Sequence, residues 1–144
     1  MKVQTMQKTN SVMRTLKAAA VLGAAFSLTA CATMGFGTPE EIVSKSSKTY
    51  WDARIKGDAA KAYGLTNAAY QQAVTLDGFK KTYPGTFAVD ADVHDVKCEP
   101  QKCEVGVNLK TNPPLPGKKI GTIDVYSKQT WLLEDGQWRL FLEP

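Results

Sequence analysis

The sequence predicts an α+β domain in which N-terminal helices pack on a curved antiparallel sheet of four or more strands. Three observations support this prediction. Residues 38–83 contain repeated helix starts and stops, residues 86–143 contain runs rich in β-branched and aromatic residues, and the two patterns do not alternate along the chain. Helices followed by consecutive strands are typical of α+β folds, in which the helices cover one face of the sheet.

The length and charge of the chain fit one globular domain without a nucleic-acid partner. At 144 residues the chain matches the size of a typical single domain. The formal charge is +4, but residues 1–30 contain four basic and no acidic side chains. The remainder has 14 basic and 14 acidic side chains. Once residues 1–30 are removed, no basic excess is left to attract nucleic acid.

Residues 13–31, MRTLKAAAVLGAAFSLTAC, have the layout of a secretory signal. Arg14 and Lys17 give the positive end, and an apolar run of 11 residues follows at 18–28. A membrane-spanning helix needs about 20 residues, so this run predicts a cleaved signal peptide. The positive region has a more usual length if translation starts at Met13, so Met1 and Met13 both stay open as the start.

The signal ends in LTAC, residues 28–31, which closely resembles the lipobox of bacterial lipoproteins. The resemblance implies diacylglycerol on the sulfur of Cys31, cleavage before Cys31 and acylation of the new amino terminus. Two or three acyl chains anchor a protein firmly, because each buried CH₂ contributes about 0.8 kcal/mol. The alternative is an ordinary secreted protein with a chance cysteine after its cleavage site.

The expected organisation is a cleaved lipoprotein signal peptide at 1–30, a lipidated tether at 31–37 and a folded domain at 38–144. Ala32, rather than an aspartate, follows the cysteine. In enterobacteria-like sorting this implies the outer membrane, although the rule varies between lineages. We therefore expect a domain that faces the periplasm and is held at the outer membrane through Cys31.

Each helix is expected from its own start and stop signals. Thr38 can cap the first helix, Pro39 suits its first position and Glu41 completes a capping box. Gly57 can end this helix and Asp58 can cap the next. The later segments are a short helix at 58–65, an irregular stretch or a further helix at 67–74, and a helix at 75–83 that is capped by Thr75 and stopped by Pro84–Gly85.

Four strand-like runs follow, at residues 86–96, 103–111, 120–134 and 137–143. Asp135 and Gly136 are typical of a two-residue hairpin loop between the last two runs. Counting back from this loop pairs Leu133 with Trp138 and Trp131 with Leu140. These four side chains share one face of the hairpin, and we expect that face to pack on the core.

The two remaining cysteines, Cys98 and Cys103, are expected to form a disulfide. With a four-residue loop at 99–102 they lie opposite each other, and the separation of their Cβ atoms is then close to the one that a disulfide requires. Disulfides persist in the oxidising compartment that the signal predicts. A zinc site is disfavoured because these two cysteines lack a matched pair of further ligands.

The alternation of apolar residues predicts a β-bulge in the first strand. Phe87, Val89, Ala91 and Val93 alternate on odd positions and are expected to face the core, whereas Val96 and Cys98 continue on even positions. A strand cannot change face without an extra residue, so we expect a bulge near His94–Asp95, opposite Gly106. Such a bulge bends the sheet.

The run TYWDARIKGDAAKAYGLTNAAYQQAVTLDGFKKTY, residues 49–83, is similar to the first half of nuclear transport factor 2-like domains. The resemblance covers roughly residues 38–142. It implies a cone in which helices wrap against a bent antiparallel sheet and leave a pocket between them. Another cystatin-like α+β sheet is the structural alternative.

The aromatic residues are the candidate pocket, and an acid–base site is less favoured. His94 is the only histidine and shares one side of its strand with Asp90 and Asp92. That side is opposite to the expected core, so these groups and Asp124 are expected in solvent. The aromatic residues that could line a pocket, or simply fill the core, are Tyr50, Trp51, Tyr63, Tyr70, Trp131 and Trp138. No cofactor or metal is implied, and phosphate-loop, nucleophile-elbow and metalloprotease motifs are absent from the sequence.

Two functions follow from this interpretation, because members of the superfamily include both enzymes and binding proteins. The favoured one is a non-enzymatic outer-membrane-anchored periplasmic lipoprotein that binds an apolar small molecule or an envelope protein. The alternative is a small isomerase- or hydrolase-like enzyme that uses the cone pocket. A buried, inward-facing carboxylate or histidine would favour the enzyme, whereas a cone filled by its own side chains would favour contact with a protein.

Overall fold

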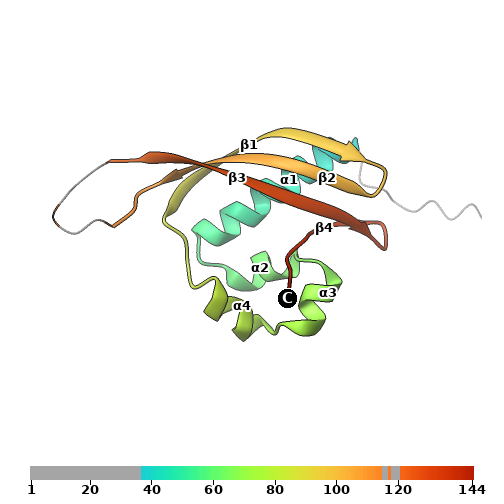
Figure 1. The fold of residues 1–144 in the computed structure, drawn as a ribbon, viewed down its shortest axis with the longest axis horizontal. Helices are drawn as coiled ribbons and strands as arrows, with labels where there is room; N and C mark the ends of the chain where they lie inside the picture. Colours follow the sequence, from blue (N-terminus) through green and yellow to red (C-terminus); the bar gives the residue numbers. More distant parts are fainter. Residues whose placement is uncertain (1–36, 115–116, 118–120) are drawn as a thin grey trace, which may run out of the picture. The chain divides into compact units, whose positions relative to one another are not determined.

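The computed structural model describes residues 37–114, 117 and 121–144, which form four helices followed by four strands (Figure 1). The signal peptide, Cys31 and most of the tether lie outside the described residues, so the anchor stays a prediction. The elements are α1 (Pro39–Ile55), α2 (Ala59–Gly64), α3 (Ala68–Ala73), α4 (Leu76–Thr82), β1 (Ala88–Glu99), β2 (Lys102–Thr111), β3 (Ile123–Glu134) and β4 (Gln137–Leu140). In this part of the chain, every helix is too short or too polar to cross a membrane.

The predicted boundaries of α1 are confirmed. The Thr38 hydroxyl accepts a hydrogen bond from the Glu41 N–H at 3.3 Å, and the Glu41 carboxylate accepts one from the Thr38 N–H at 3.2 Å. These reciprocal bonds satisfy two N–H groups that a helix start leaves unpaired. After α1, Gly57 adopts a φ of 74°, and the Asp58 carboxylate caps α2 by accepting from the Lys61 N–H at 3.0 Å.

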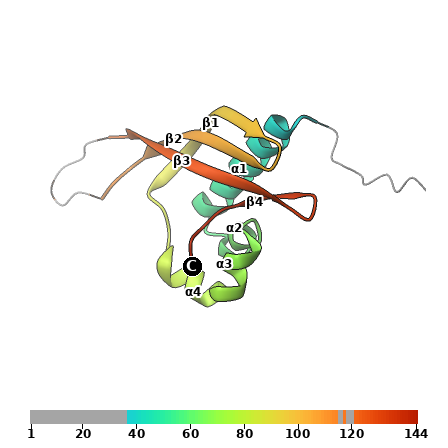
Figure 2. The same ribbon diagram turned by 45° about the vertical axis from the view of Figure 1, so that its right-hand side comes forward.

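Three short helices lie below the sheet and close the bottom of the core (Figures 1 and 2). The stretch at 67–74 forms a separate helix, α3, which settles the alternative that the sequence leaves open. Thr75 caps α4 as predicted, because its hydroxyl accepts from the Gly78 N–H at 3.2 Å. Phe79 of α4 is fully buried and anchors this helix to the core.

The four strands form one antiparallel sheet in the order β1-β2-β3-β4, and the helices cover one of its faces (Figures 1 and 2). The predicted α+β fold is therefore confirmed. We call the face that carries Val107 and Trp131 the inner face, because both side chains are fully buried there. The opposite side, which carries Glu104 and Lys128, is the outer face.

The predicted bulge in β1 is confirmed one residue further along the chain. His94 pairs with Gly106 and Lys97 with Glu104, so Asp95 and Val96 together oppose a single residue of β2. Asp95 has a φ of 50°, which is uncommon for a residue other than glycine. The strand bends at this point because one partner residue faces two.

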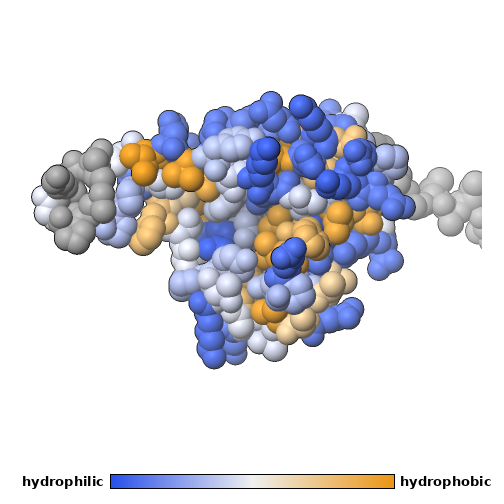
Figure 3. All heavy atoms as spheres, viewed as in Figure 1, coloured by the Kyte–Doolittle hydropathy of each residue, from blue (hydrophilic) through white to orange (hydrophobic). Residues whose placement is uncertain are grey.

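A second irregularity in β1 makes one prediction wrong. Ala88 pairs with Thr111 and Asp90 with Lys110, so Val89 is an extra residue. The face of the strand shifts there, and Ala88 is buried while Phe87 and Val89 are 62% and 50% exposed. Phe87 and Val89 therefore do not face the core. Hydrophobic atoms also gather on the surface at the end of the sheet where β3 begins (Figure 3), and Ile123 and Val125 at the start of β3 are exposed.

Both hairpins form at the predicted places. Leu133 pairs with Trp138 and Trp131 with Leu140, and the intervening Asp135 and Gly136 have φ values of 48° and 76°. Positive φ at both positions is the geometry that Asp-Gly favours in a two-residue turn. Of the four paired side chains, Trp131 and Leu140 are buried, while Leu133 and Trp138 are half-buried.

The disulfide between Cys98 and Cys103 is confirmed, with their Cα atoms 4.1 Å apart. The loop that it crosses is shorter than predicted. Glu99 pairs with Lys102, so the turn consists of Pro100 and Gln101 rather than of four residues. The disulfide therefore closes a tight hairpin and constrains only a short loop.

Replacing both Cys98 and Cys103 with alanine is expected to lower the free energy of unfolding by about 2 kcal/mol, because a short closed loop removes little entropy from the unfolded chain. Alanine is preferred to serine because Cys103 is fully buried. Urea denaturation of the variant measures the loss, and reduced wild-type protein is the control. A loss above about 4 kcal/mol in the free energy of unfolding would show that the disulfide stabilises parts of the domain beyond its own hairpin.

Candidate functional site

Apart from a cavity beside Trp51, side chains of the protein fill the core between the helices and the sheet. Trp131 is fully buried, and its indole N–H donates to the Gln129 side-chain oxygen at 3.2 Å. The same oxygen accepts from the Ser47 hydroxyl of α1. This buried hydrogen-bonded group joins α1 to β3, so the polar atoms at the centre of the core satisfy one another.

A buried arginine closes the lower end of the core. The Arg54 guanidinium donates to the Gly85 carbonyl at 2.8 Å and lies 5.1 Å from the Tyr83 ring centroid and 5.7 Å from that of Phe79. Aromatic faces attract a cation, which compensates in part for its burial. Burial raises the pKa of the neighbouring Tyr50 hydroxyl, although the Arg54 charge opposes this effect.

None of the buried residues in the described structure is an aspartate, glutamate or histidine. His94, expected in solvent, is half-buried on the outer face, and its Nε2 is shielded from solvent without a hydrogen-bond partner. The buried polar side chains of the described residues are Ser47, Arg54, Thr66, Asn67 and Gln129. Thr66 and Asn67, which lie between α2 and α3, also have hydrogen-bond partners. The Thr66 hydroxyl donates to the Tyr63 carbonyl at 2.7 Å, and the Asn67 side-chain oxygen accepts from the Leu142 N–H at 2.9 Å. These groups hold the fold together and offer no proton donor or acceptor of the kind that the enzyme hypothesis needs.

Two of the six candidate pocket residues, Tyr50 and Trp51, line a cavity of about 270 Å³. Its other walls are β3 residues 127–130 and the C-terminal residues 140–142. We call it the Trp51 cavity. The Trp51 indole nitrogen is shielded from solvent and has no hydrogen-bond partner. This cavity opens at the place where the chain after β4 leaves the edge of β3.

The other four candidate aromatics lie elsewhere. Tyr63 and Tyr70 pack with Phe79 in an aromatic cluster, with ring centroids 5.6 Å and 6.3 Å from that of Phe79. Trp131 lies in the core, and Trp138 is half-buried in the last hairpin. The six residues are thus distributed over the cavity, the aromatic cluster, the core and the last hairpin.

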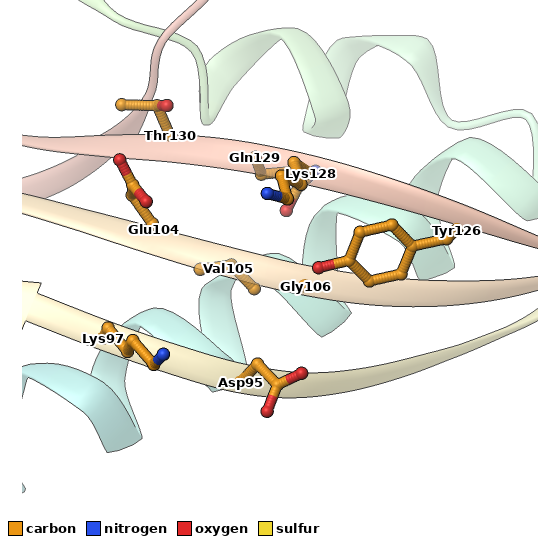
Figure 4. Close-up of a pocket in the computed structure, with 9 residues that line it drawn as sticks. All are labelled: Asp95, Lys97, Glu104, Val105, Gly106, Tyr126, Lys128, Gln129 and Thr130. Atoms are coloured by element: carbon orange, nitrogen blue, oxygen red, sulfur yellow. The ribbon is translucent and has the colours of Figure 1, made fainter.

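A hollow of about 410 Å³ lies on the outer face of the sheet (Figure 4). We call it the outer groove. Its lining comes from three strands: Asp95 and Lys97 of β1, Glu104, Val105 and Gly106 of β2, and Tyr126, Lys128, Gln129 and Thr130 of β3. Sequence reasoning did not find this site, since its residues are far apart in the chain.

Gly106 pairs with His94 beside the bulge, and its missing side chain leaves room for two rings over the β2 backbone. A Cβ atom there would lie 2.9 Å from the Tyr126 hydroxyl and 3.3 Å from the His94 ring. The His94 ring packs 5.8 Å from the Tyr126 ring, and its Nδ1 lies 2.8 Å from the Asp95 carboxylate. The two rings therefore border the glycine, and the bulge turns Asp95 toward the groove.

Both signs of charge line the outer groove. Asp95 and Glu104 are acidic, whereas Lys97 and Lys128 are basic. A hydrogen bond from Lys102 at 2.8 Å, helped by its charge, lowers the pKa of Glu104. The Glu104 carboxylate is thus held ionised and is suited to pairing with a cation rather than to donating a proton.

The acidic residues that flank His94 do not form a metal site. Asp90 and Asp92 are exposed on the outer face, and the nearest cation to Asp90 is Lys48, at 3.7 Å. Asp124 is exposed as well. Within residues 37–114, 117 and 121–144, the structure contains no cluster of three or more side chains that could ligate a metal ion.

Comparison with known proteins gives matches among solved structures only. No protein-family model matches the chain, and no curated protein matches it. A proposed NTF2-like transpeptidase from Campylobacter jejuni superposes with a TM-score of 0.54 at 10% identity, over 70% of this chain and 98% of that one. NTF2 is nuclear transport factor 2. The fold is NTF2-like.

Two SEC-C motif proteins have similar structures. The protein from Psychrobacter arcticus has a TM-score of 0.55 at 12% identity, over 73% of this chain and 61% of its own. The protein from Rhodopseudomonas palustris has a TM-score of 0.52 at 9% identity, over 67% of this chain and 73% of its own. At such low identity the likeness shows the fold alone. The hollows of this domain that contain an aromatic ring and several strand residues include the Trp51 cavity and the outer groove.

Proposed function

We propose that the protein is a lipid-anchored outer-membrane protein whose NTF2-like domain binds a segment of another envelope protein in the outer groove, without catalysis. The observation that carries this proposal is the contrast between the two faces of the sheet. The inner face is covered by the helices, and side chains of the protein fill the core apart from the Trp51 cavity. A hollow of about 410 Å³ lies on the outer face and is open to a partner.

The chemistry of the outer groove favours a protein segment over an apolar small molecule. Ligand pockets are mostly apolar with a few polar groups, whereas this groove carries two carboxylates and two ammonium groups around one aromatic ring. Charged and polar rims with an aromatic residue are common at protein interfaces. The isomerase or hydrolase alternative has less support, because the described interior offers no acid or base.

The proposed location follows from the lipobox and the tether. Six residues, 32–37, separate Cys31 from the cap of α1 at Thr38. An extended chain reaches at most about 3.3–3.6 Å per residue, so the first helix would start within about 20 Å of the lipid headgroups. The disulfide supports an oxidising compartment such as the periplasm. The partner is accordingly expected close to the membrane.

A photo-crosslinking amino acid at Lys97 or Glu104 is expected to capture a discrete envelope protein when the full-length protein is expressed in its host. Lys80 of α4 is the control position, because it is exposed and lies outside the groove. Replacing Lys97 with glutamate, with the crosslinker at Glu104, should reduce capture roughly fivefold, which corresponds to about 1 kcal/mol.

Melting temperatures of the same variants show whether the fold is intact. Equal capture from Lys80, or capture that is unchanged by the Lys97→Glu substitution in folded protein, would contradict the outer groove as the binding site. Turnover of an added ester or ketosteroid by the pure protein, lost on substitution of groove residues, would contradict the non-catalytic part of the proposal.

A further inference from the structure

Part of the β3 edge has no neighbouring strand in the described structure. β4 pairs only with Trp131–Glu134, and beyond it the Phe141 N–H donates to the Thr130 carbonyl at 2.8 Å. On this side of β3, residues 123–129 have no backbone partner among the described residues. Figure 1 shows the short β4 beside one end of β3 only.

The backbone groups that point out of this edge can be assigned. In a strand, the N–H and C=O of one residue point to the same side, and successive residues alternate. The Thr130 carbonyl faces the β4 side, where it accepts from Phe141. The N–H and C=O groups of Asp124, Tyr126 and Lys128 therefore also point to this side, into the open edge.

The β3 edge differs from the other edge of the sheet. β1 carries two register shifts and a series of charged residues, both of which discourage strand addition. β3 pairs with β2 through ten consecutive residue pairs without a break. It also exposes three large apolar or aromatic side chains, with Ile123 and Val125 each 42% exposed and Tyr126 53% exposed. A regular edge with exposed apolar residues is a template for another strand.

The sequence along this edge is complementary to itself. Asp124 and Lys128 lie two residues on either side of Tyr126 and share the outer face with it. If a second β3 runs antiparallel with a two-fold axis at Tyr126, each Asp124 faces Lys128 of the other copy and the two Tyr126 rings are neighbours. Opposite charges and aromatic pairs directly across a ladder are favourable. In the described part of the chain, neither Asp124 nor Lys128 belongs to an ion pair.

We propose that two copies of this protein pair through residues 124–128 of β3 to form one continuous eight-stranded sheet. The outward-pointing groups of Asp124, Tyr126 and Lys128 match those of the second copy in this register, so each pair is of the hydrogen-bonded kind. The pairing ends after Lys128, because Phe141 already occupies the edge at Thr130. A closed two-fold contact of this kind uses the same surface on both copies.

The proposed register of the two β3 strands also places the exposed Ile123 against an apolar surface of the second copy. Ile123 lies on the inner face, since it alternates with Val125, Ser127 and Gln129 along β3. In the second copy it would lie opposite Gln129, which lines the Trp51 cavity. Each Ile123 would therefore enter the Trp51 cavity of the other copy, beside Tyr50 and Trp51. This contact would cover apolar surface that is exposed in a single copy.

The test uses a cysteine at the two-fold position. Because Cys31 is the proposed lipid site and Cys98 and Cys103 form a disulfide, Tyr126→Cys adds the one free thiol of the mature chain. A short bis-maleimide applied to membranes that contain the full-length variant is expected to give a covalent homodimer. Asp92→Cys on the exposed outer face of β1 is the control and should give at least tenfold less dimer.

Charge reversal then tests the register. In the Tyr126→Cys protein, Asp124→Lys or Lys128→Asp alone should reduce the dimer about tenfold, and the two together should restore it. Failure of the double variant to restore the dimer, equal dimer from Asp92→Cys, or a product with a different protein in place of the homodimer would each overturn the proposal. Tyr126 and Lys128 also line the outer groove, so the crosslinking from Lys97 and Glu104 is carried out in protein that keeps both residues and tests the groove separately.

Discussion

Trp131→Ala is expected to lower the free energy of unfolding by about 3–5 kcal/mol, the usual range for truncation of a large aromatic residue in a core. Trp131 is fully buried and lies between Cys103 of β2 and Leu140 of β4 in the sheet. Its removal leaves a cavity that three strands border. It also takes away the indole N–H that donates to Gln129, although Ser47 still donates to the same oxygen.

Trp138→Ala is the matched control for this substitution. Trp138 belongs to the same hairpin but is only half-buried, so its truncation should cost about 1–2 kcal/mol. Urea denaturation followed by far-ultraviolet circular dichroism measures both variants without relying on tryptophan fluorescence. Equal losses for Trp131 and Trp138 would mean that Trp131 does not form the centre of the core.

The elements that could be predicted from the sequence are those whose signals are local. Thr38, Gly57 and Asp58 fix helix ends through contacts within four residues, and each acts in the structure as its residue type indicates. The Asp135–Gly136 turn likewise fixes the register of the last hairpin. The same is true of Cys98 and Cys103, because a short hairpin leaves them no other relative position.

The errors arise where the register depends on residues that give no local signal. Val89 is a β-branched residue in an alternating run, and nothing around it marks it as an extra residue in the strand. The residues that face the core therefore change at Val89 without a signal in the sequence, and Phe87 is exposed. The bulge at Asp95–Val96 was predictable because the change of alternation lies in the sequence itself.

The candidate site was harder to predict than the fold. The sequence does not distinguish aromatic residues that line a cavity, such as Tyr50 and Trp51, from those that pack in a cluster, such as Tyr63 and Tyr70. The outer groove depends on Gly106 of β2 lying between His94 of β1 and Tyr126 of β3. Only the pairing of three strands brings these residues together, and the residue pattern within one strand does not indicate how that strand pairs with others.

Cys31→Ser is expected to abolish lipid attachment completely and to leave a larger, unprocessed precursor. In the lipobox interpretation the Cys31 sulfur carries the diacylglycerol, and cleavage follows that modification, so a serine blocks both steps. Because each buried CH₂ contributes about 0.8 kcal/mol, loss of all acyl chains removes the whole membrane affinity that the anchor supplies. The domain itself starts at Thr38 and should fold as before.

Metabolic labelling of the full-length protein with a palmitate analogue, followed by gel electrophoresis, measures lipid attachment and precursor size together. Cys98→Ala with Cys103→Ala is the matched control, because it removes two cysteines of the domain and should keep the label. Label that persists in the Cys31→Ser protein would contradict the lipoprotein proposal. A wild-type chain that is processed without label would instead indicate the ordinary secreted protein. In that case the partner of the outer groove would no longer have to lie near the membrane, since the tether is the only reason to place it there.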